Sequence, residues 1–173
     1  MKTQSNWPAR SLSPRVRQSK LRPTSTPTAG LVRDTVVLTR NGEVAVQDIR
    51  PGEHVITRGA GLVQVLAIGQ HRVLSRAISI AAGSLGDTRP DSDMVVPADQ
   101  QILIRDWRAQ ALFGCDQTLA PASALVDGEF IRDLGLQVLE LYSLQLDDDH
   151  VIYAGGLEVV GGARPELDLR PAA

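Results

Sequence analysis

Few side chains in this chain can act as nucleophiles or carry protons near neutral pH. Its 173 residues include one cysteine, Cys115, and three histidines, His54, His71 and His150. A single cysteine excludes an internal disulfide and a cysteine-based zinc site, and Cys115 itself is predicted to be a small, half-buried apolar residue. His54 and His71 lie next to turn or polar residues, so we expect both to face solvent. Any reaction at this protein therefore depends on a small number of positions.

The one cluster with the composition of a metal site is the run Asp147-Asp148-Asp149-His150. Carboxylates beside an imidazole are suitable ligands for a divalent cation. Adjacent residues of a strand point to opposite faces, however, and an acidic hairpin turn accounts for the same run. We therefore expect no bound metal here, and no motif in the sequence indicates a cofactor.

The composition predicts a single domain with an aliphatic core. Hydrophobic residues make up 43% of the chain and charged residues 22%, whereas aromatic residues contribute only 3%. A chain of this length can bury one substantial core, which must then consist of Val, Leu, Ile and Ala. The charge is divided unevenly, because the first 30 residues hold six of the 18 basic residues and none of the 20 acidic ones. The rest of the chain therefore carries a net charge of −8.

Residues 1–29 are predicted to be a disordered basic arm, since Pro, Ser, Thr and basic residues dominate them. The arm is either a plain leader or a tether to nucleic acid or another anionic surface, and a tether would be sensitive to salt. No segment approaches the roughly 18 apolar residues of a membrane helix, and the arm lacks the apolar stretch of a secretory signal, so a cytoplasmic location is expected. The residues that would contact an anionic surface are Arg10, Arg15, Arg17, Lys20 and Arg22.

After the arm, short apolar alternations broken by turn residues predict an all-β domain. Residues 35–39 and 43–49 flank Asn41-Gly42, the strongest short signal for a hairpin. Residues 61–74 should form an extended or bent strand with a bulge at Gly69. Further strands are predicted at 54–58, 77–82, 93–97, 100–105, 109–114, 136–146 and 150–155. Only residues 121–128, with Pro121 at the start and Gly128 at the end, indicate a helical turn.

Three blocks of the sequence, in this order, carry a resemblance to a known family. They are GLVRDTVVLTRNGEVAVQDIRPGEHVITR from Gly30, then SIAAGSLG with ALFGCDQTLAPASALVDG, and finally LYSLQLDDDHVIYAGGL. Residues 30–160 thus resemble the bacterial Hint (Hedgehog/intein) domain, leaving 161–173 as a C-terminal tail. The resemblance implies a compact all-β fold of hairpins, in which two halves can pair about a pseudo-twofold axis, with at most one short helix.

The resemblance also implies which positions would carry a self-cleavage reaction. In Hint domains a first-position cysteine or serine attacks the preceding peptide bond, and a TxxH pair polarises that bond and handles the proton. Gly30 matches the first position, Pro97 the threonine and Gln100 the histidine. Ser143 stands where inteins have an aspartate. His150 matches a later histidine, unless the bacterial subfamily places it one residue earlier, at Asp149.

These departures predict a degenerate site without catalytic residues. Glycine has no side chain with which to attack, and glutamine cannot accept a proton near neutral pH. We therefore expect a binding or structural module whose partner is another protein. The alternative is an active autoprocessing domain that cuts near Ala29-Gly30 with a displaced nucleophile, for which Thr28, Thr35 and Cys115 are the candidates. Association with nucleic acid through the arm is a third interpretation.

Overall fold

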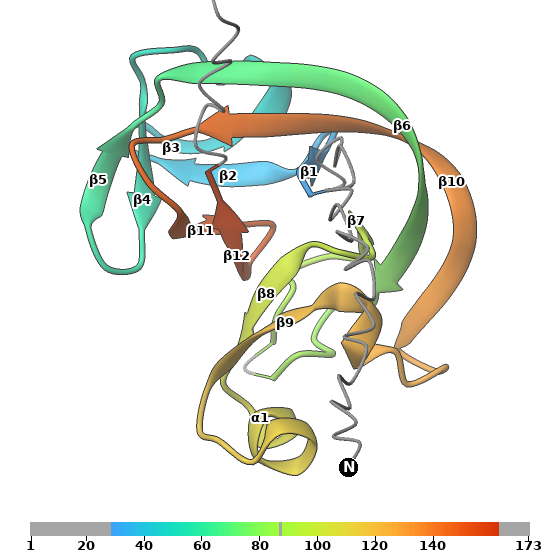
Figure 1. Ribbon diagram of the computed structural model, residues 1–173. Coiled ribbons are helices and arrows are strands. Elements are labelled where there is room, and N and C mark those ends of the chain that lie inside the picture. Colours follow the sequence, from blue (N-terminus) through green and yellow to red (C-terminus); the bar gives the residue numbers. More distant parts are fainter. Residues whose placement is uncertain (1–28, 87, 163–173) are drawn as a thin grey trace, which may run out of the picture.

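The computed structural model describes residues 29–86 and 88–162, which form antiparallel hairpins (Figure 1). The prediction of an all-β fold with at most one short α-helix is confirmed. The strands are β1 (Leu31–Val32), β2 (Val36–Thr39), β3 (Gly42–Ala45), β4 (His54–Thr57), β5 (Gly61–Gln64), β6 (Ala67–Ile80), β7 (Met94–Pro97), β8 (Gln101–Ile104), β9 (Thr118–Pro121), β10 (Ile131–Gln145), β11 (His150–Ala154) and β12 (Leu157–Gly161). The helical segments are α1 (Trp107–Phe113) and the 3-10 turns η1 (Val46–Asp48) and η2 (Ala122–Leu125).

These strands form two separate sheets. The first has the order β1-β10-β6-β7, and the second runs β3-β2-β4-β11-β12-β8-β9 with β5 added on β4. The long strands β6 and β10 pair from Ile80 with Ile131 to Ala67 with Gln145. Together they form the curved ribbon that arches over the other strands in Figure 1. β1 and β7 are the two ends of the first sheet, so each has one side that is not paired within that sheet, and the two strands lie near each other.

The core is aliphatic, as the low aromatic content predicts. Its largest fully buried side chains are those of isoleucine, leucine and valine, drawn from both sheets. Burial of this kind stabilises the fold by about 25 cal/mol for each Å² of apolar surface removed from water. These side chains include Val37, Val46, Val55, Val65, Ile78, Ile80, Ile102, Ile131, Leu141, Leu146 and Ile152.

The hairpin predicted at Asn41-Gly42 is present as β2 and β3. Val36 pairs with Ala45 and Thr39 with Gly42. Gly42 has a φ of +102°, a conformation that glycine adopts without a steric penalty. The hydroxyl of Thr39 donates to the Gly42 carbonyl and accepts from the Asn41 amide, so a side chain closes the turn.

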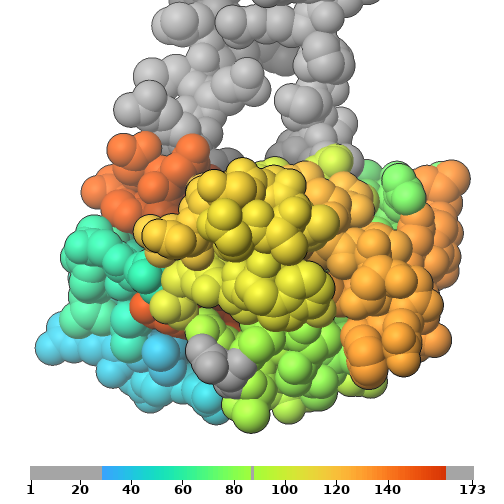
Figure 2. Space-filling model, turned by 90° about the horizontal axis from the view of Figure 1, so that it is seen from below, coloured from blue at the N-terminus to red at the C-terminus, as the bar shows by residue number. Residues whose placement is uncertain are grey.

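The strand predicted at residues 109–114 is wrong, because this segment lies mainly in α1. Two capping residues define the helix. The Asp106 carboxylate accepts from the Arg108 amide at 3.0 Å, and Gly114 ends the helix with a φ of +69°. Trp107, Leu112 and Phe113 are exposed, and the segment around α1 lies at the surface in Figure 2. Within the described parts of the chain, no helix is long and apolar enough to cross a membrane.

Two further expectations need adjustment. The helical turn predicted at 121–128 exists only as the short 3-10 turn η2, since β9 extends to Pro121. The bulge predicted at Gly69 is absent, because Gly69 pairs in regular register with Ser143. The irregularity in this ribbon lies between Asp133 and Gly135, where Gly135 has a φ of +72°.

Candidate functional site

Three of the six positions predicted from the resemblance meet in one small cavity. Gly30, Gln100 and Ser143 line a space of about 80 Å³ where β1, β10, β11 and β12 come together. Gly30 and Gln100 are 70 residues apart in the sequence, and Ser143 lies still further along the chain, so only the fold brings the three together. The other lining residues are Ala29, Leu31, Tyr142, Leu144, Ile152, Val160, Gly161 and Gly162.

The backbone register directs the amide of Gly30 into this cavity. Leu31 lies opposite Tyr142, and the Arg33 amide donates to the Glu140 carbonyl at 3.1 Å. In an antiparallel ladder, residues that bond to the partner strand alternate with residues whose amides point away from it, and Gly30 is one of the second kind. The Gly30 N–H therefore points away from β10 and needs a different partner.

Gln100 supplies that partner. Its side-chain oxygen accepts a hydrogen bond from the Gly30 amide at 3.2 Å. Its side-chain nitrogen donates to the Val160 carbonyl at 2.9 Å and to the Gln101 carbonyl at 3.2 Å. Only 1% of Gln100 is exposed to solvent. One buried carboxamide thus joins the start of β1 to β12, and all three hydrogen bonds go to backbone groups.

The backbone of Gln100 is held as firmly as its side chain. The Gln100 amide donates to the Pro97 carbonyl at 3.0 Å, and its own carbonyl accepts from Ala122 at the same distance. Pro97 is buried at the end of β7. Because the Ala98 amide bonds to Arg76 on β6, the neighbouring position 97 faces the open edge, where the missing N–H of proline removes no ladder bond. The turn from Pro97 to Gln100 therefore fixes where the carboxamide lies.

The Gln100 side chain offers the Gly30 nitrogen a hydrogen-bond acceptor and no proton. Cleavage before Gly30 must deliver a proton to the Gly30 nitrogen, and the atom facing that nitrogen is an amide oxygen, which only accepts hydrogen bonds. Gly30 adds no nucleophile. A Cβ at position 30 would lie 3.2 Å from the backbone carbonyl oxygen of Tyr142 and 3.3 Å from the Leu141 Cβ. These contacts are tight and require a small local shift.

Ser143 lies in the cavity but is positioned by packing on the neighbouring strand. It pairs with Gly69, and a Cβ built on Gly69 would come within 2.6 Å of the Ser143 Oγ. The serine side chain thus occupies the space that glycine leaves on β6. This contact gives Ser143 a structural explanation that needs no reaction.

Asp149 and His150 do not line the cavity. Asp149 is exposed in the turn before β11, and His150 is the first residue of that strand. The His150 Nε2 lies 2.8 Å from the Asp147 Oδ1, and this hydrogen bond lowers the pKa of the exposed Asp147 carboxyl. Among the described residues, no group of three or more His, Cys, Asp or Glu side chains is arranged to hold a metal ion. Asp148 accepts instead from the Asp149 amide, as in an acidic turn.

None of the candidate replacement nucleophiles that the structure describes reaches the junction. Thr35 precedes β2 and lines a separate groove, and Cys115 follows α1. Neither lines the cavity around Gly30. Thr28 and the basic residues of the arm lie outside the described residues. His54 on β4 and His71 on β6 are both partly exposed to solvent.

A buried carboxylate that sequence reasoning missed holds four segments together. Glu158 on β12 is only 2% exposed and binds three arginines. Arg105 contacts it at 2.8 Å and Arg89 at 3.2 Å, and Arg58 completes the set. Burial alone would raise the pKa of Glu158, but the hydrogen bond from Arg58 and the charges of Arg105 and Arg58 hold that pKa below its ordinary value of 4.5. The available signal was an acidic residue inside the apolar run Leu157–Val160.

Comparisons with known proteins agree with this geometry. The family model of the Hint domain matches residues 29–159. The structure is similar to an intein-like domain from Clostridium thermocellum, at 18% identity and a TM-score of 0.57, covering 78% of this chain and 99% of that one. It is also similar to the MchDnaB-1 intein (N145AA), at 15% identity and a TM-score of 0.50, covering 77% and 99%. At these identities the likeness concerns the fold. No curated protein matches the sequence.

Proposed function

The chain belongs to the Hint domain family, and we propose that it retains the family's fold without its self-cleavage reaction and serves as a binding or structural module. The observation that supports this most strongly is the Gln100 carboxamide, which accepts from the Gly30 amide inside a closed hydrogen-bond set. In this interpretation the place of a proton-handling side chain is taken by one that fastens β1 to β12.

The expected loss of rate is large. Without a side chain at position 30 the step that forms an ester or thioester has no nucleophile. Losing an oriented general acid or base typically lowers a rate by a further 10²–10⁴-fold where any reaction remains. Attack geometry is also strict, so a distant nucleophile cannot replace the missing one without moving several ångströms.

Without the reaction, the domain is an all-β scaffold whose surface can bind other molecules. A hairpin fold with open sheet edges can bind another chain, and we expect the partner to be a protein. The cytoplasmic location stays a prediction.

The proposal predicts that the native full-length chain stays whole. After a day at neutral pH, with or without dithiothreitol, intact-mass spectrometry should show one species at the mass of the complete sequence. Dithiothreitol is included because it would release a thioester if one formed. A denatured sample taken at zero time serves as the mass reference.

A fragment that begins at or near Gly30 would overturn the proposal and make the chain an autoprocessing enzyme. Its nucleophile would then be found with three conservative variants, Thr28→Val, Thr35→Val and Cys115→Ala. The variant that stops cleavage would identify it.

A further inference from the structure

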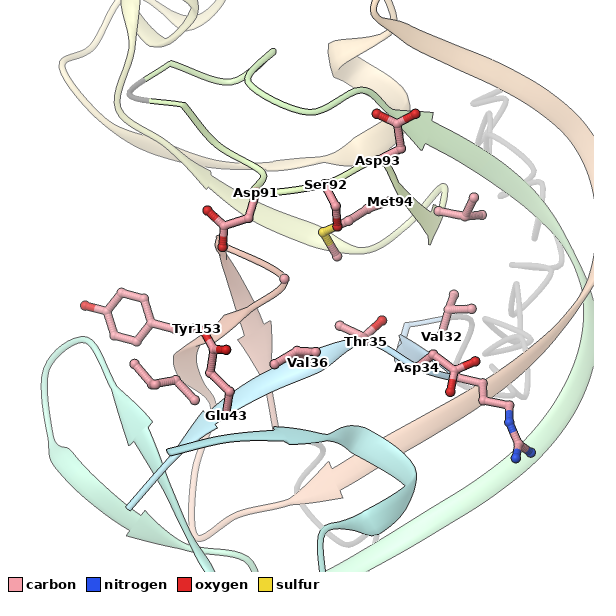
Figure 3. A pocket seen from close by; sticks show the side chains of 15 residues that line it. Val32, Asp34, Thr35, Val36, Glu43, Asp91, Ser92, Asp93, Met94 and Tyr153 are labelled. Carbon is pink, nitrogen blue, oxygen red and sulfur yellow. The ribbon is translucent and has the colours of Figure 1, made fainter. Parts of the chain in front are cut away.

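A second cavity, lined by residues of other strands, lies apart from the site around Gly30 and Gln100. It is a groove of about 610 Å³ between β1, β2 and β7. Figure 3 shows Asp91, Ser92 and Asp93 on one side of it and the segment from Val32 to Val36 on the other. Glu43 and Tyr153 stand at one end. A cavity of this size accommodates a short peptide segment or a small molecule.

The groove combines an apolar lining with an acidic rim. Its apolar residues include Val32, Val36, Leu38, Met94 and Val95. Four carboxylates also line it, those of Asp34, Glu43, Asp91 and Asp93. The one basic residue among its lining is Arg33, which already contacts Glu140 at 3.3 Å. A ligand that fits this lining carries positive charge and some apolar side chains.

The groove also offers backbone hydrogen-bonding groups. Val32 and Val95 lie on β1 and β7, the two ends of the four-stranded sheet. Met94 and Val96 are the residues of β7 that bond to β6, so the N–H and C=O of Val95 point away from β6 toward the groove. An extended chain can add to such an edge by main-chain hydrogen bonds, while its side chains enter the groove. The ligand class indicated is therefore an extended basic peptide.

One segment of this chain has that chemistry. Residues 10–22 read RSLSPRVRQSKLR, in which five basic residues alternate with Leu12, Val16 and Leu21 and no acidic residue occurs. The segment lies outside the described residues, and the chain that follows it enters the domain at Gly30, two residues before Val32 of the groove. Seven residues lie between position 22 and Gly30, and the eight Cα–Cα steps from 22 to 30 can span about 27 Å when extended. The tether therefore reaches the groove easily.

We propose that the groove between β1, β2 and β7 binds the chain's own basic segment, residues 10–22. The inference rests on the proposed function, because only a chain that is not cut before Gly30 keeps this segment attached. Attachment matters energetically, since a short flexible tether gives an effective concentration on the order of millimolar. Even a weak contact is then mostly occupied, and a separate peptide at micromolar concentration competes poorly.

The test compares full-length proteins that differ in charge only. One variant replaces Arg15, Arg17, Lys20 and Arg22 by glutamine. Its matched control replaces Arg40, Arg50, Arg72 and Arg132, four exposed basic residues of the domain, in the same way. Amide signals of Val32–Val36 and Asp91–Val95 are followed by NMR. Neutralising the segment should shift these signals relative to the native protein. Raising the salt from about 50 to 500 mM should shift the native signals in the same direction. The control variant should have the same groove signals as the native protein.

A synthetic peptide of residues 10–22 provides the second measurement. It should titrate the groove signals of the segment-neutralised variant and bind the native chain at least about tenfold more weakly, because the attached segment competes. In the segment-neutralised background, Glu43→Gln with Asp91→Asn should weaken the peptide several-fold. Asp116→Asn with Glu129→Gln, an equal charge change on exposed residues away from the groove, should not.

Three results would overturn the inference. The first is that the groove signals coincide in the native and segment-neutralised proteins. The second is that the peptide binds these two proteins equally, and the third is that the segment's own signals respond to a DNA duplex while the groove signals stay unchanged. Intact mass measured on the same samples separates the two proposals. A cut chain contradicts the loss of self-cleavage, whereas a whole chain with an unresponsive groove contradicts only the docking.

Discussion

Replacing Gly30 by cysteine should restore thiol-dependent cleavage after Ala29 efficiently only when Gln100 is replaced by histidine as well. The cysteine supplies the nucleophile that position 30 lacks. Gln100 lies 3.2 Å from the nitrogen that must leave, but its facing oxygen cannot give that nitrogen a proton. A histidine at position 100 can do so. We expect the double variant to cleave about 10²–10⁴-fold faster than Gly30→Cys alone.

The measurement is the rate at which the fragment beginning at residue 30 accumulates in dithiothreitol, followed by mass spectrometry. Gly30→Ala with Gln100→His is the matched control and should stay whole, because histidine without a nucleophile forms no thioester. The thermal midpoint of each variant shows that it is folded. Equal rates for Gly30→Cys with and without the histidine, or a folded double variant that never cleaves, would contradict this assignment of the two positions.

The largest stability loss is expected for Glu158→Gln. The substitution keeps the shape of the side chain but leaves three arginines, Arg58, Arg89 and Arg105, around a group without charge. Removing one partner of a buried ion pair typically costs about 3–5 kcal/mol of stability. Partial exposure of the arginines reduces this cost, so we expect the free energy of unfolding to fall by about 3 kcal/mol. For a domain of this size that corresponds to a fall of about 10 °C in the thermal midpoint. Glu129→Gln, on an exposed glutamate, should change stability by less than about 0.5 kcal/mol.

The same pair of proteins should show a specific pH dependence. Because the folded pKa of Glu158 is below its ordinary value of 4.5, its contribution to stability is complete above that value. The contribution is lost as the pH falls through the folded pKa, since protonation removes the charge that the arginines bind. Denaturant unfolding should therefore show a wide gap between native and Glu158→Gln at pH 7 that narrows below pH 4.5. A gap that stays constant down to pH 3 would contradict the assignment.

Much of the fold could be predicted because its signals are local. The Asn41-Gly42 turn and the alternating runs on either side define β2 and β3 without help from distant residues. The segment from 109 to 114 was misassigned for the opposite reason. Its short apolar run is compatible with a strand or a helix. The capping residues Asp106 and Gly114 favour the helix α1, and a prediction from the pattern of apolar residues does not include them.

The candidate site could be predicted only as a set of positions. The family resemblance predicts that Gly30 and Gln100 occupy the reactive positions, but the hydrogen bond between them depends on the register of β1 against β10. The partner of the Gln100 nitrogen is a backbone carbonyl, Val160, which has no sequence signature. Glu158 and the acidic groove were missed for a similar reason, because their residues come from segments far apart in the chain.

The central claim is that Gln100 holds the Gly30 amide in a structural hydrogen bond, in the place where a reactive Hint domain has a proton-handling histidine. Site-resolved hydrogen exchange at the Gly30 amide tests this directly, in the native full-length chain and in Gln100→Ala. The account predicts that the Gly30 amide is protected in the native protein and that Gln100→Ala lowers its protection to that of an unstructured peptide, while the amides of β6 stay protected. A Gly30 amide that exchanges freely in the native chain, or one whose protection is unchanged without Gln100, would contradict it.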